Sequence, residues 1–444
     1  MQTIRHDPDY FQVRTLNIVH LTPGAGAMYC GGCFRDNALV QALRQLGHAT
    51  TMVPLYLPLN LEEADQSAGT PVFFSGINVY LEQKYPWFRR APRWLNRLLA
   101  SPVLLRRIGR SAAKTRPEEV GDLTVSMLRG EAGAQARELA ELIRWLKTQP
   151  PPDVIVLSNA LLLGAARQLR SALRAPVVCT LQGEMGFLEG LPEPYQQQTW
   201  QLLRERAAEV DLIVAPSEYF GELMRERLGV LADRMRVIYN GINLTGYAPA
   251  ENFPSPPALG FFARLCAEKG LNLLVDAFLM LKQRQRIPQL QLRLGGSLGP
   301  ADEPLVHELM DRIKRQGFGR EVTLRPNLNR ADKQAFFRTL SVLSVPVTQG
   351  EAFGLYVLES LASGVPVVLP ACGAFPELVT ATGGGVIFEP ALAPALADAV
   401  EPLLLEPQRL RTLAQAGRAA VIKNFSIERM AREMAEAYYG LKKT

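Results

Sequence analysis

The chain has 444 residues, of which 48% are apolar and 21% are charged, and its formal net charge is +6. This composition excludes a disordered chain, and the length favours two domains of roughly 200 residues each over a single core. The first residues lack the apolar core of a signal peptide, and no stretch approaches the roughly 18 to 20 apolar residues that cross a bilayer. We therefore expect a cytoplasmic protein.

Short apolar runs alternate with amphipathic stretches of helical period along the chain, a pattern that predicts parallel sheets covered by helices. The first series of expected strands spans 16–21, 153–157, 176–181, 211–215 and 235–239. The second series spans 258–262, 290–294, 321–324, 341–345, 365–369 and 385–388. We predict an α/β protein with two Rossmann-like, doubly wound domains that face each other across a cleft.

A proline-rich segment without hydrophobic period, 246–259, separates the two series and is typical of a linker. We divide the chain into domains at 1–248 and 249–425, followed by a final segment at 426–444. That segment carries a helix pattern that opens after Ser426, a suitable N-cap, and we expect it to return to the first domain.

A glycine-rich stretch follows the first expected strand and leads into a helix expected from residue 37 to residue 46. Glycine lets the backbone approach a phosphate or sugar closely, so Gly31 and Gly32 are candidates for one wall of an anion site. Cys30 and Cys33 form a CxxC in the same stretch. A zinc or redox site is not expected, because the chain has no second CxxC and only four scattered histidines.

A basic stretch from Lys84 to Arg116 holds ten Lys or Arg and no Asp or Glu. Its apolar and arginine faces separate at helical spacing, the pattern of an interfacial helix on anionic lipid. A surface helix packed on the first domain is the alternative. An anionic membrane surface, at the inner face of the cell membrane, is therefore a candidate partner. Nucleic acid is not expected, since no recognised binding module is present.

Two cations, Arg264 and Lys269, follow the first strand of the second series. Ligands bind at such carboxyl ends of strands in open α/β sheets. The fork of arginine and the point charge of lysine both suit a diphosphate. A pair of solvated loop residues is the alternative for these two positions.

The segment EAFGLYVLESLASGVP places Glu351 in a loop after a strand and Glu359 inside the helix that follows. Gly354 stands where the helix starts, so its backbone offers free N–H groups to an anion. Two helical turns, about 12 Å, separate the carboxylates, a span comparable with that between the sugar and the ribose of a nucleotide-sugar. Solvated charges on an ordinary helix are the alternative, but apolar residues flank Glu359.

These motifs, in this order, resemble family 4 of the retaining glycosyltransferases, which have the GT-B fold. The resemblance covers nearly the whole chain and rests on the paired glycines, Tyr239-Asn240-Gly241-Ile242, Arg264 with Lys269, and the two glutamates seven residues apart. It implies metal-independent transfer of a hexosyl group, with retention, from a nucleotide-diphosphate sugar, a UDP-sugar favoured, to a glycan, lipid or small-molecule acceptor. No cofactor is implied.

The resemblance also implies roles for individual residues. Glu351 would contact the hydroxyls of the donor sugar, and Glu359 would take those of the ribose. Arg264 and Lys269 would hold the diphosphate and stabilise the leaving charge, so that these two and Glu351 are the expected catalytic residues. The further donor-binding residues would be Gly31, Gly32, Phe353, Gly354 and Leu355. The acceptor would then lie mainly on the first domain.

One departure concerns Gln182-Gly183-Glu184, where many relatives carry His-Gly. Glutamine can donate a hydrogen bond but cannot be protonated near neutral pH. We place Gln182 and Glu184 on the acceptor side.

Two alternative functions remain open. A glycogen- or starch-type glucan synthase is suggested by residues 54–58 and 76–80, although those enzymes carry a lysine before the paired glycines and this chain has Tyr29-Cys30. The other is a catalytically silent protein that binds a nucleotide-sugar.

Overall fold

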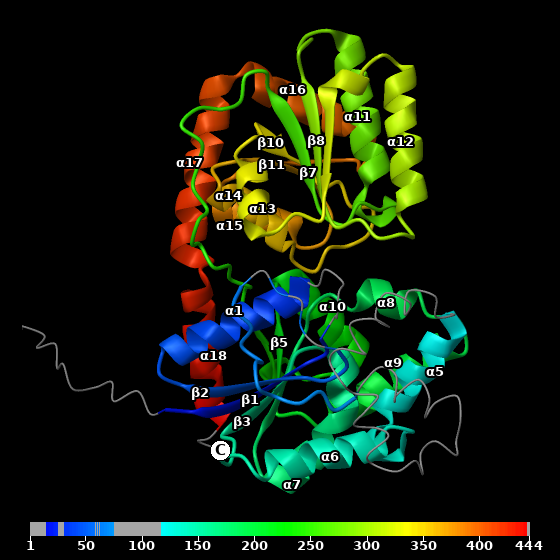
Figure 1. The fold of residues 1–444 in the computed structure, drawn as a ribbon, viewed down its shortest axis with the longest axis vertical. Coiled ribbons are helices and arrows are strands. Elements are labelled where there is room, and N and C mark those ends of the chain that lie inside the picture. The colour runs from blue at the N-terminus through cyan, green and yellow to red at the C-terminus, as the bar shows by residue number, and fades with distance from the viewer. Residues whose placement is uncertain are drawn as a thin grey trace, which may run out of the picture.

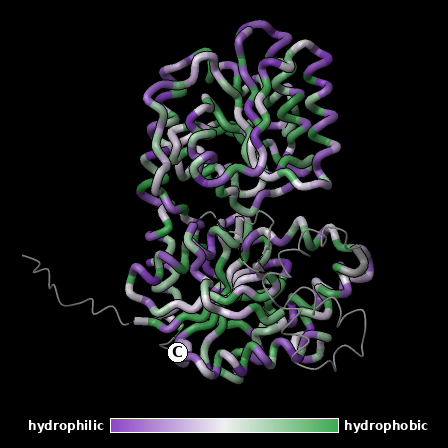
Figure 2. The backbone as a smooth tube through the Cα atoms, in the orientation of Figure 1, coloured by the Kyte–Doolittle hydropathy of each residue, from purple (hydrophilic) through white to green (hydrophobic). Residues whose placement is uncertain are grey.

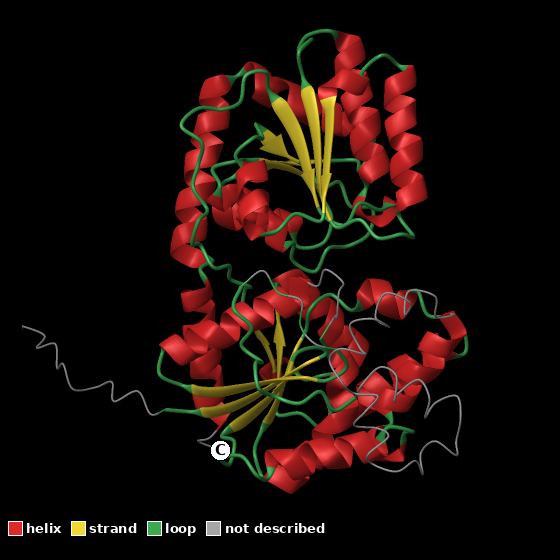
Figure 3. Ribbon diagram, in the orientation of Figure 1, coloured by secondary structure: helices red, strands yellow, loops and turns green. Residues whose placement is uncertain are grey.

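The computed structural model describes residues 15–24, 31–57, 59, 61, 63–74 and 117–441. These residues form two α/β domains stacked along the long axis of the molecule, each a six-stranded parallel sheet between helices (Figures 1 and 3). The predicted fold class is confirmed. The basic stretch from Lys84 to Arg116 and Cys30 lie outside the described residues.

The first sheet has the strand order β2-β1-β3-β4-β5-β6. Its strands are β1 (Asn17–Thr22), β2 (Ala49–Pro54), β3 (Val154–Leu157), β4 (Val177–Thr180), β5 (Leu212–Ala215) and β6 (Met235–Val237). Its helices are α1 (Gly31–Gln45), α5 (Pro117–Leu128), α6 (Ala136–Leu146), α7 (Ala166–Leu173), α8 (Met185–Glu189), α9 (Tyr195–Ala207) and α10 (Glu218–Leu228).

The second sheet has the order β12-β11-β10-β7-β8-β9, which is the order of a Rossmann fold counted from β7. Its strands are β7 (Ala258–Phe262), β8 (Gln291–Gly296), β9 (Val322–Pro326), β10 (Val342–Leu343), β11 (Val367–Pro370) and β12 (Gly385–Phe388). Its helices are α11 (Leu271–Arg284), α12 (Glu303–Arg315), α13 (Arg330–Phe337), α14 (Leu355–Ala362), α15 (Phe375–Thr382), α16 (Ala393–Leu405) and α17 (Pro407–Asn424).

Strand order reverses between β1 and β3 in the first sheet and between β7 and β10 in the second. In open α/β sheets, ligands bind outside the carboxyl ends of the strands at such a reversal. The turn after β1 leads to Gly31, the turn after β7 carries Arg264 and Lys269, and the loop after β10 carries Glu351. Topology therefore brings the predicted motifs to the facing edges of the two sheets.

Alternate residues of the strands in the first sheet belong to two apolar clusters, one on each face of the sheet. Hydrophobic residues run along these strands (Figure 2). On one face of the first sheet, Ile18 and Val154 pack with α1; on the other, Val19 and Ile155 pack with the helices near α9. Burial of apolar area at about 25 cal/mol per Å² stabilises this arrangement.

The chain crosses between the domains twice, at adjacent points. After α17 it returns as α18 (Ile427–Leu441), which packs against α1 and the first sheet through Met430, Met434 and Tyr438 (Figure 1). The two crossings are hydrogen bonded: the Ile242 N–H donates to the Phe425 carbonyl and the Ile427 N–H donates to the Ile242 carbonyl, each at 3.0 Å. The two crossing segments, one at Ile242 and the other at Phe425–Ile427, thus form one joint between the domains.

Two details differ from the sequence prediction. Strand β2 was missed, because its sequence ATTMVP lacks an aliphatic run and ends in proline. Helix α1 begins at Gly31 rather than at residue 37, so the paired glycines belong to the helix start and not to a preceding loop. The predicted N-cap of the last helix is confirmed, since the Ser426 hydroxyl accepts from the Arg429 N–H at 3.2 Å.

Within the described part of the chain, no helix is long and apolar enough to cross a membrane. The same residues contain no group of three or more His, Cys, Asp or Glu that is placed to hold a metal ion.

Candidate functional site

A cavity of about 300 Å³ lies between the two domains and is lined by residues of both. It brings together nearly all of the residues that the sequence singles out. Those that line it are Gly31, Gly32, Gln182, Arg264, Lys269, Glu351, Phe353, Gly354, Leu355 and Glu359. Glu184 is not among the residues that line this cavity.

Two helices begin at opposite walls of the cavity. Gly31 starts α1 in the first domain, and Leu355 starts α14 in the second. A Cβ atom added to Gly31 would lie 4.0 Å from the Leu355 side chain, so the two helix starts face each other closely. Both helices direct the positive end of a helix dipole toward the space between them, which favours an anion there.

Gly354 is required by the backbone at the start of α14. Its φ of +92° lies in the left-handed region, and a Cβ there would come within 3.1 Å of the Phe375 ring. A side chain would therefore be strained and would crowd the helix start. The glycine keeps the N–H groups of α14 open to a ligand.

Lys269 and Glu351 form an ion pair, with the lysine Nζ 2.6 Å from the glutamate Oε2. The Tyr356 hydroxyl donates to the same oxygen at 2.8 Å. Burial, and then the negative charge of Glu351, raise the pKa of Tyr356 well above its usual value, so this hydroxyl stays protonated and remains a donor. Lys269 and Tyr356 thus hold the Glu351 carboxylate in place near the N-terminus of α14.

The position of Lys269 depends on Gly270, which has a φ of +75°. A Cβ at this position would lie 1.7 Å from the Pro346 carbonyl oxygen, so the turn after β7 packs directly on the chain that follows β10. Only glycine permits this approach. Packing of the two turns brings the lysine of one to the glutamate of the other.

Glu359 is held by two residues that sequence reasoning missed. The Tyr247 hydroxyl and the Lys333 Nζ each lie 2.7 Å from its Oε1 atom. The side chain of Lys333 is only 2% exposed. A signal for Lys333 was present, since it shares a helical face with the buried Phe336 and Phe337, where a solvated lysine would not stand.

Arg264 lies at the rim of the cavity, and its side chain is 53% exposed. Its guanidinium donates to both carboxylate oxygens of Asp302, at 2.9 and 3.2 Å. The hydrogen bonds to Asp302 raise the pKa of Arg264 further, so it is charged at any working pH. Asp302 was not expected from the sequence; it orients the arginine fork beside the helix starts.

Glu184, which we predicted to lie on the acceptor side, is hydrogen bonded through its carboxylate to the backbone of its own domain. Its carboxylate is buried and accepts three backbone N–H groups, those of Ala160, Gln182 and Gly183, at 2.9, 3.1 and 3.0 Å. Both of its oxygens are therefore engaged with the chain behind the cavity wall. We assign Glu184 as a positioning residue for the turn that carries Gln182.

Glu184→Ala should lower the free energy of unfolding by about 2 to 3 kcal/mol, because buried N–H groups lose a charged acceptor. The midpoint of urea denaturation measures this change. Glu189→Ala is the matched control, since Glu189 is an exposed carboxylate of the next helix, and its midpoint should stay near that of the unaltered protein. Equal midpoints for the two variants would contradict the assignment.

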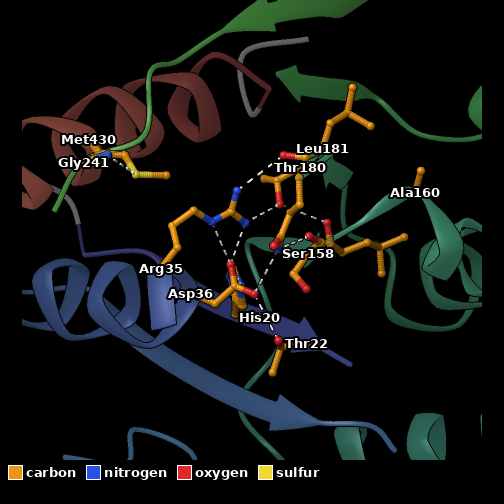
Figure 4. Close-up of polar contacts among 12 residues, drawn as sticks. His20, Thr22, Arg35, Asp36, Ser158, Ala160, Thr180, Leu181, Gly241 and Met430 are labelled. Carbon is orange, nitrogen blue, oxygen red and sulfur yellow. Dashed lines mark hydrogen bonds and ion pairs between the residues drawn. The ribbon is translucent and has the colours of Figure 1, made fainter. Parts of the chain in front are cut away.

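A buried polar network stands behind Gln182 (Figure 4). At its centre is Asp36 of α1, which is fully buried and whose Oδ1 accepts from the Arg35 guanidinium at 2.6 and 3.1 Å. The Thr22 hydroxyl donates to its Oδ2 at 3.0 Å, and the His20 Nε2 lies 3.4 Å from its Oδ1. Arg35 also donates to the Thr180 hydroxyl at 3.1 Å, which links α1 to β4. No residue of this network was predicted.

Two Rossmann-like domains that face each other across a cleft, with helix N-termini on opposite walls, define the GT-B class of glycosyltransferase folds. Residues 248–420 match the family described as "Glycosyl transferases group 1", and residues 108–245 match the one described as "Glycosyltransferase Family 4". The chain therefore consists of two glycosyltransferase domains of the family 4 type, as its motifs indicated.

A protein with a similar sequence is also described as a glycosyltransferase. The chain is 32% identical over 201 residues to the lipopolysaccharide core biosynthesis mannosyltransferase LpsB of Rhizobium meliloti, covering 44% of this chain and 54% of that protein. The chain spans about half the length of the curated relatives it matches.

Two solved structures share the fold over nearly the whole chain. Sucrose-phosphate synthase of Thermosynechococcus elongatus has a TM-score of 0.69 at 19% identity, covering 97% of this chain and 100% of that one. HepE of Anabaena, solved with UDP and glucose, has a TM-score of 0.65 at 19% identity, covering 95% and 99%.

Proposed function

We propose that this protein transfers a hexosyl group, with retention of anomeric configuration, from a UDP-sugar to a glycan, lipid or small-molecule acceptor, without a metal ion. The observation that carries the proposal is one cavity, lined by Lys269, in which two helix N-termini face each other. Glu351, before the start of α14, and Glu359, inside α14, line the same cavity. The complex of HepE with UDP and glucose, a protein of the same fold, agrees with this type of donor.

The diphosphate of the donor fits between the starts of α1 and α14. Backbone N–H groups from both helices and the charges of Lys269 and Arg264 would surround its oxygens. Glu359, held by Tyr247 and Lys333 on the nucleoside side, would accept the ribose hydroxyls. Glu351, held by Lys269 and Tyr356, would accept hydroxyls of the sugar.

In the reaction, the bond between the anomeric carbon and the β-phosphate oxygen breaks, and a bond from the acceptor oxygen to the same face of that carbon forms. The acceptor proton passes to the departing phosphate, so no separate base is needed. Lys269 and the two helix starts stabilise the negative charge that develops on the leaving diphosphate. Closure of the domains would remove water from this charge and strengthen the stabilisation.

A donor screen tests the proposal. The purified protein is incubated with UDP-, GDP- and ADP-sugars in the presence of EDTA, and release of the nucleoside diphosphate is measured with and without a mixture of sugar acceptors. We expect release from a UDP-sugar that EDTA does not reduce, and product analysis by NMR should show an α-linkage from an α-linked donor. Loss of activity in EDTA that Mg²⁺ restores would overturn metal independence, and an inverted linkage would overturn retention.

A further inference from the structure

The side-chain amide of Gln182 has one orientation that its surroundings enforce. Its Nε2 donates to Asp36 Oδ2 at 3.3 Å and also to the carbonyl oxygen of Ser158. A carboxylate and a carbonyl can only accept hydrogen bonds, so both neighbours require the nitrogen of the amide to point at them. Rotation of the amide by 180° would replace two hydrogen bonds by two contacts between oxygen atoms.

Asp36 is suited to this task because it remains an ionised, fixed acceptor. Burial acts to raise its pKa, but the charges of Arg35 and His20 outweigh burial and hold the pKa well below its usual range. The Thr22 hydroxyl and the Arg35 guanidinium determine which way the carboxylate faces. The amide orientation therefore does not change with pH under working conditions.

The oxygen of the amide faces Gly32, a residue of the cavity wall. Gln182 and Gly32 both line the cavity, and a Cβ added to Gly32 would lie 1.6 Å from Gln182 Oε1. The neighbouring Gly183 lies close to the second domain, since a Cβ there would be 3.1 Å from the Ala352 side chain, next to Glu351. The oxygen therefore stands beside the helix start of α1, on the wall opposite the carboxylate that we assign to the sugar.

We propose that Gln182 determines specificity by presenting only a hydrogen-bond acceptor to one hydroxyl of the donor sugar, with Asp36 as the residue that sets its orientation. The inference deepens the proposed function and rests on it. A hydroxyl can donate to this oxygen, whereas a hydrogen or fluorine substituent cannot. An imidazole N–H at the same position would have the opposite polarity, so replacement of histidine by glutamine exchanges a donor for an acceptor.

A series of donor analogues tests this polarity. Each hydroxyl of the transferred sugar except that at the anomeric carbon is replaced in turn by hydrogen and by fluorine, and kcat/KM is measured for the protein and for Gln182→Ala. At one position we expect the unaltered protein to prefer the hydroxyl by at least about tenfold over the deoxy sugar, and the variant to lose this preference. Equal ratios for the two proteins at every position would overturn the proposal.

Asp36→Asn tests the positioning role. The asparagine oxygen would stay on Arg35 and its amide nitrogen would face Gln182, which favours the flipped amide and places N–H groups in the cavity. We expect this variant to accept the fluoro sugar at the sensitive position several-fold better, relative to the hydroxyl sugar, than the unaltered protein does. Thr22→Val is the matched control, since it removes one hydrogen bond to Asp36 and keeps the charge, and it should retain the original preference.

Two further measurements keep failure of this inference distinct from failure of the proposed function. UDP binding by calorimetry should be unchanged in Gln182→Ala, because the proposed contact of Gln182 is with the sugar, which UDP lacks. Absence of UDP binding in the unaltered protein would count against the proposed function. The side-chain NH₂ signal of Gln182, assigned by its loss in Gln182→Ala, should be protected from hydrogen exchange without any ligand. Rapid exchange of both protons would overturn the orientation whatever the activity is.

Discussion

Lys269→Ala should reduce kcat/KM for the donor by about 100-fold or more, with most of the loss in kcat. The lysine lines the same cavity as the two helix starts and pairs with Glu351. In the proposed reaction, the leaving diphosphate would acquire negative charge in this cavity as its bond to the sugar breaks. Its side chain is 30% exposed, so its removal should change the free energy of unfolding little. Steady-state kinetics of nucleotide release, with a denaturation curve for each protein, measures both effects.

Two controls separate charge from position in this experiment. Lys269→Arg keeps the positive charge and should retain more activity than the alanine variant. Arg264→Ala removes a cation from the rim that is more exposed and is tied to Asp302, so we expect a smaller loss than for Lys269. A kcat that is the same for Lys269→Ala and the unaltered protein would contradict the role of this lysine in stabilising the leaving group.

Glu359→Ala should weaken UDP binding by roughly 10- to 100-fold, the loss expected when a charged acceptor of hydrogen bonds is removed. It should also destabilise the fold by about 3 kcal/mol, because the nearly buried Lys333 loses a carboxylate that lies 2.7 Å from its Nζ. Calorimetric titration with UDP measures the first effect and urea denaturation the second.

The double variant Glu359→Gln with Lys333→Met distinguishes the two roles of Glu359. Removal of both charges of this ion pair together avoids breaking a nearly buried pair on one side only, so the double variant should recover much of the stability lost in Glu359→Ala. It should not recover UDP affinity, since no carboxylate faces the ribose. Recovery of affinity together with stability would mean that Glu359 acts only through the fold.

The sequence predicted the sheets and the cation and carboxylate motifs well, because each of these signals is local. A strand is an apolar run, and the segment that holds Glu351 and Glu359 is a continuous piece of chain. Residues that complete the site are distant in sequence: Tyr247 is 112 positions from Glu359, and Lys333 is 26. Tyr247 lies in the proline-rich linker, where no periodicity marks a buried hydroxyl.

The network behind Gln182 was missed for a related reason. Arg35 and Asp36 are adjacent in sequence and look like two solvated charges near the start of a helix. Their burial follows from the packing of α1 between the first sheet and α18, which the hydrophobic pattern of α1 alone does not reveal. The backbone hydrogen bonds of Glu184 were not predicted, because the sequence shows that a carboxylate is near a glycine turn but not which way it faces.

The double crossing between the domains limits the way in which the cleft can open. A single flexible tether leaves one body free to twist about another, but two chain segments hydrogen bonded side by side at Ile242 and Ser426–Ile427 resist twisting and still allow bending. The joint therefore permits bending of one domain against the other and restricts twisting between them. Closure by bending at this joint would bring the start of α1 toward the start of α14 along one path, so the two helix starts would meet in a defined alignment.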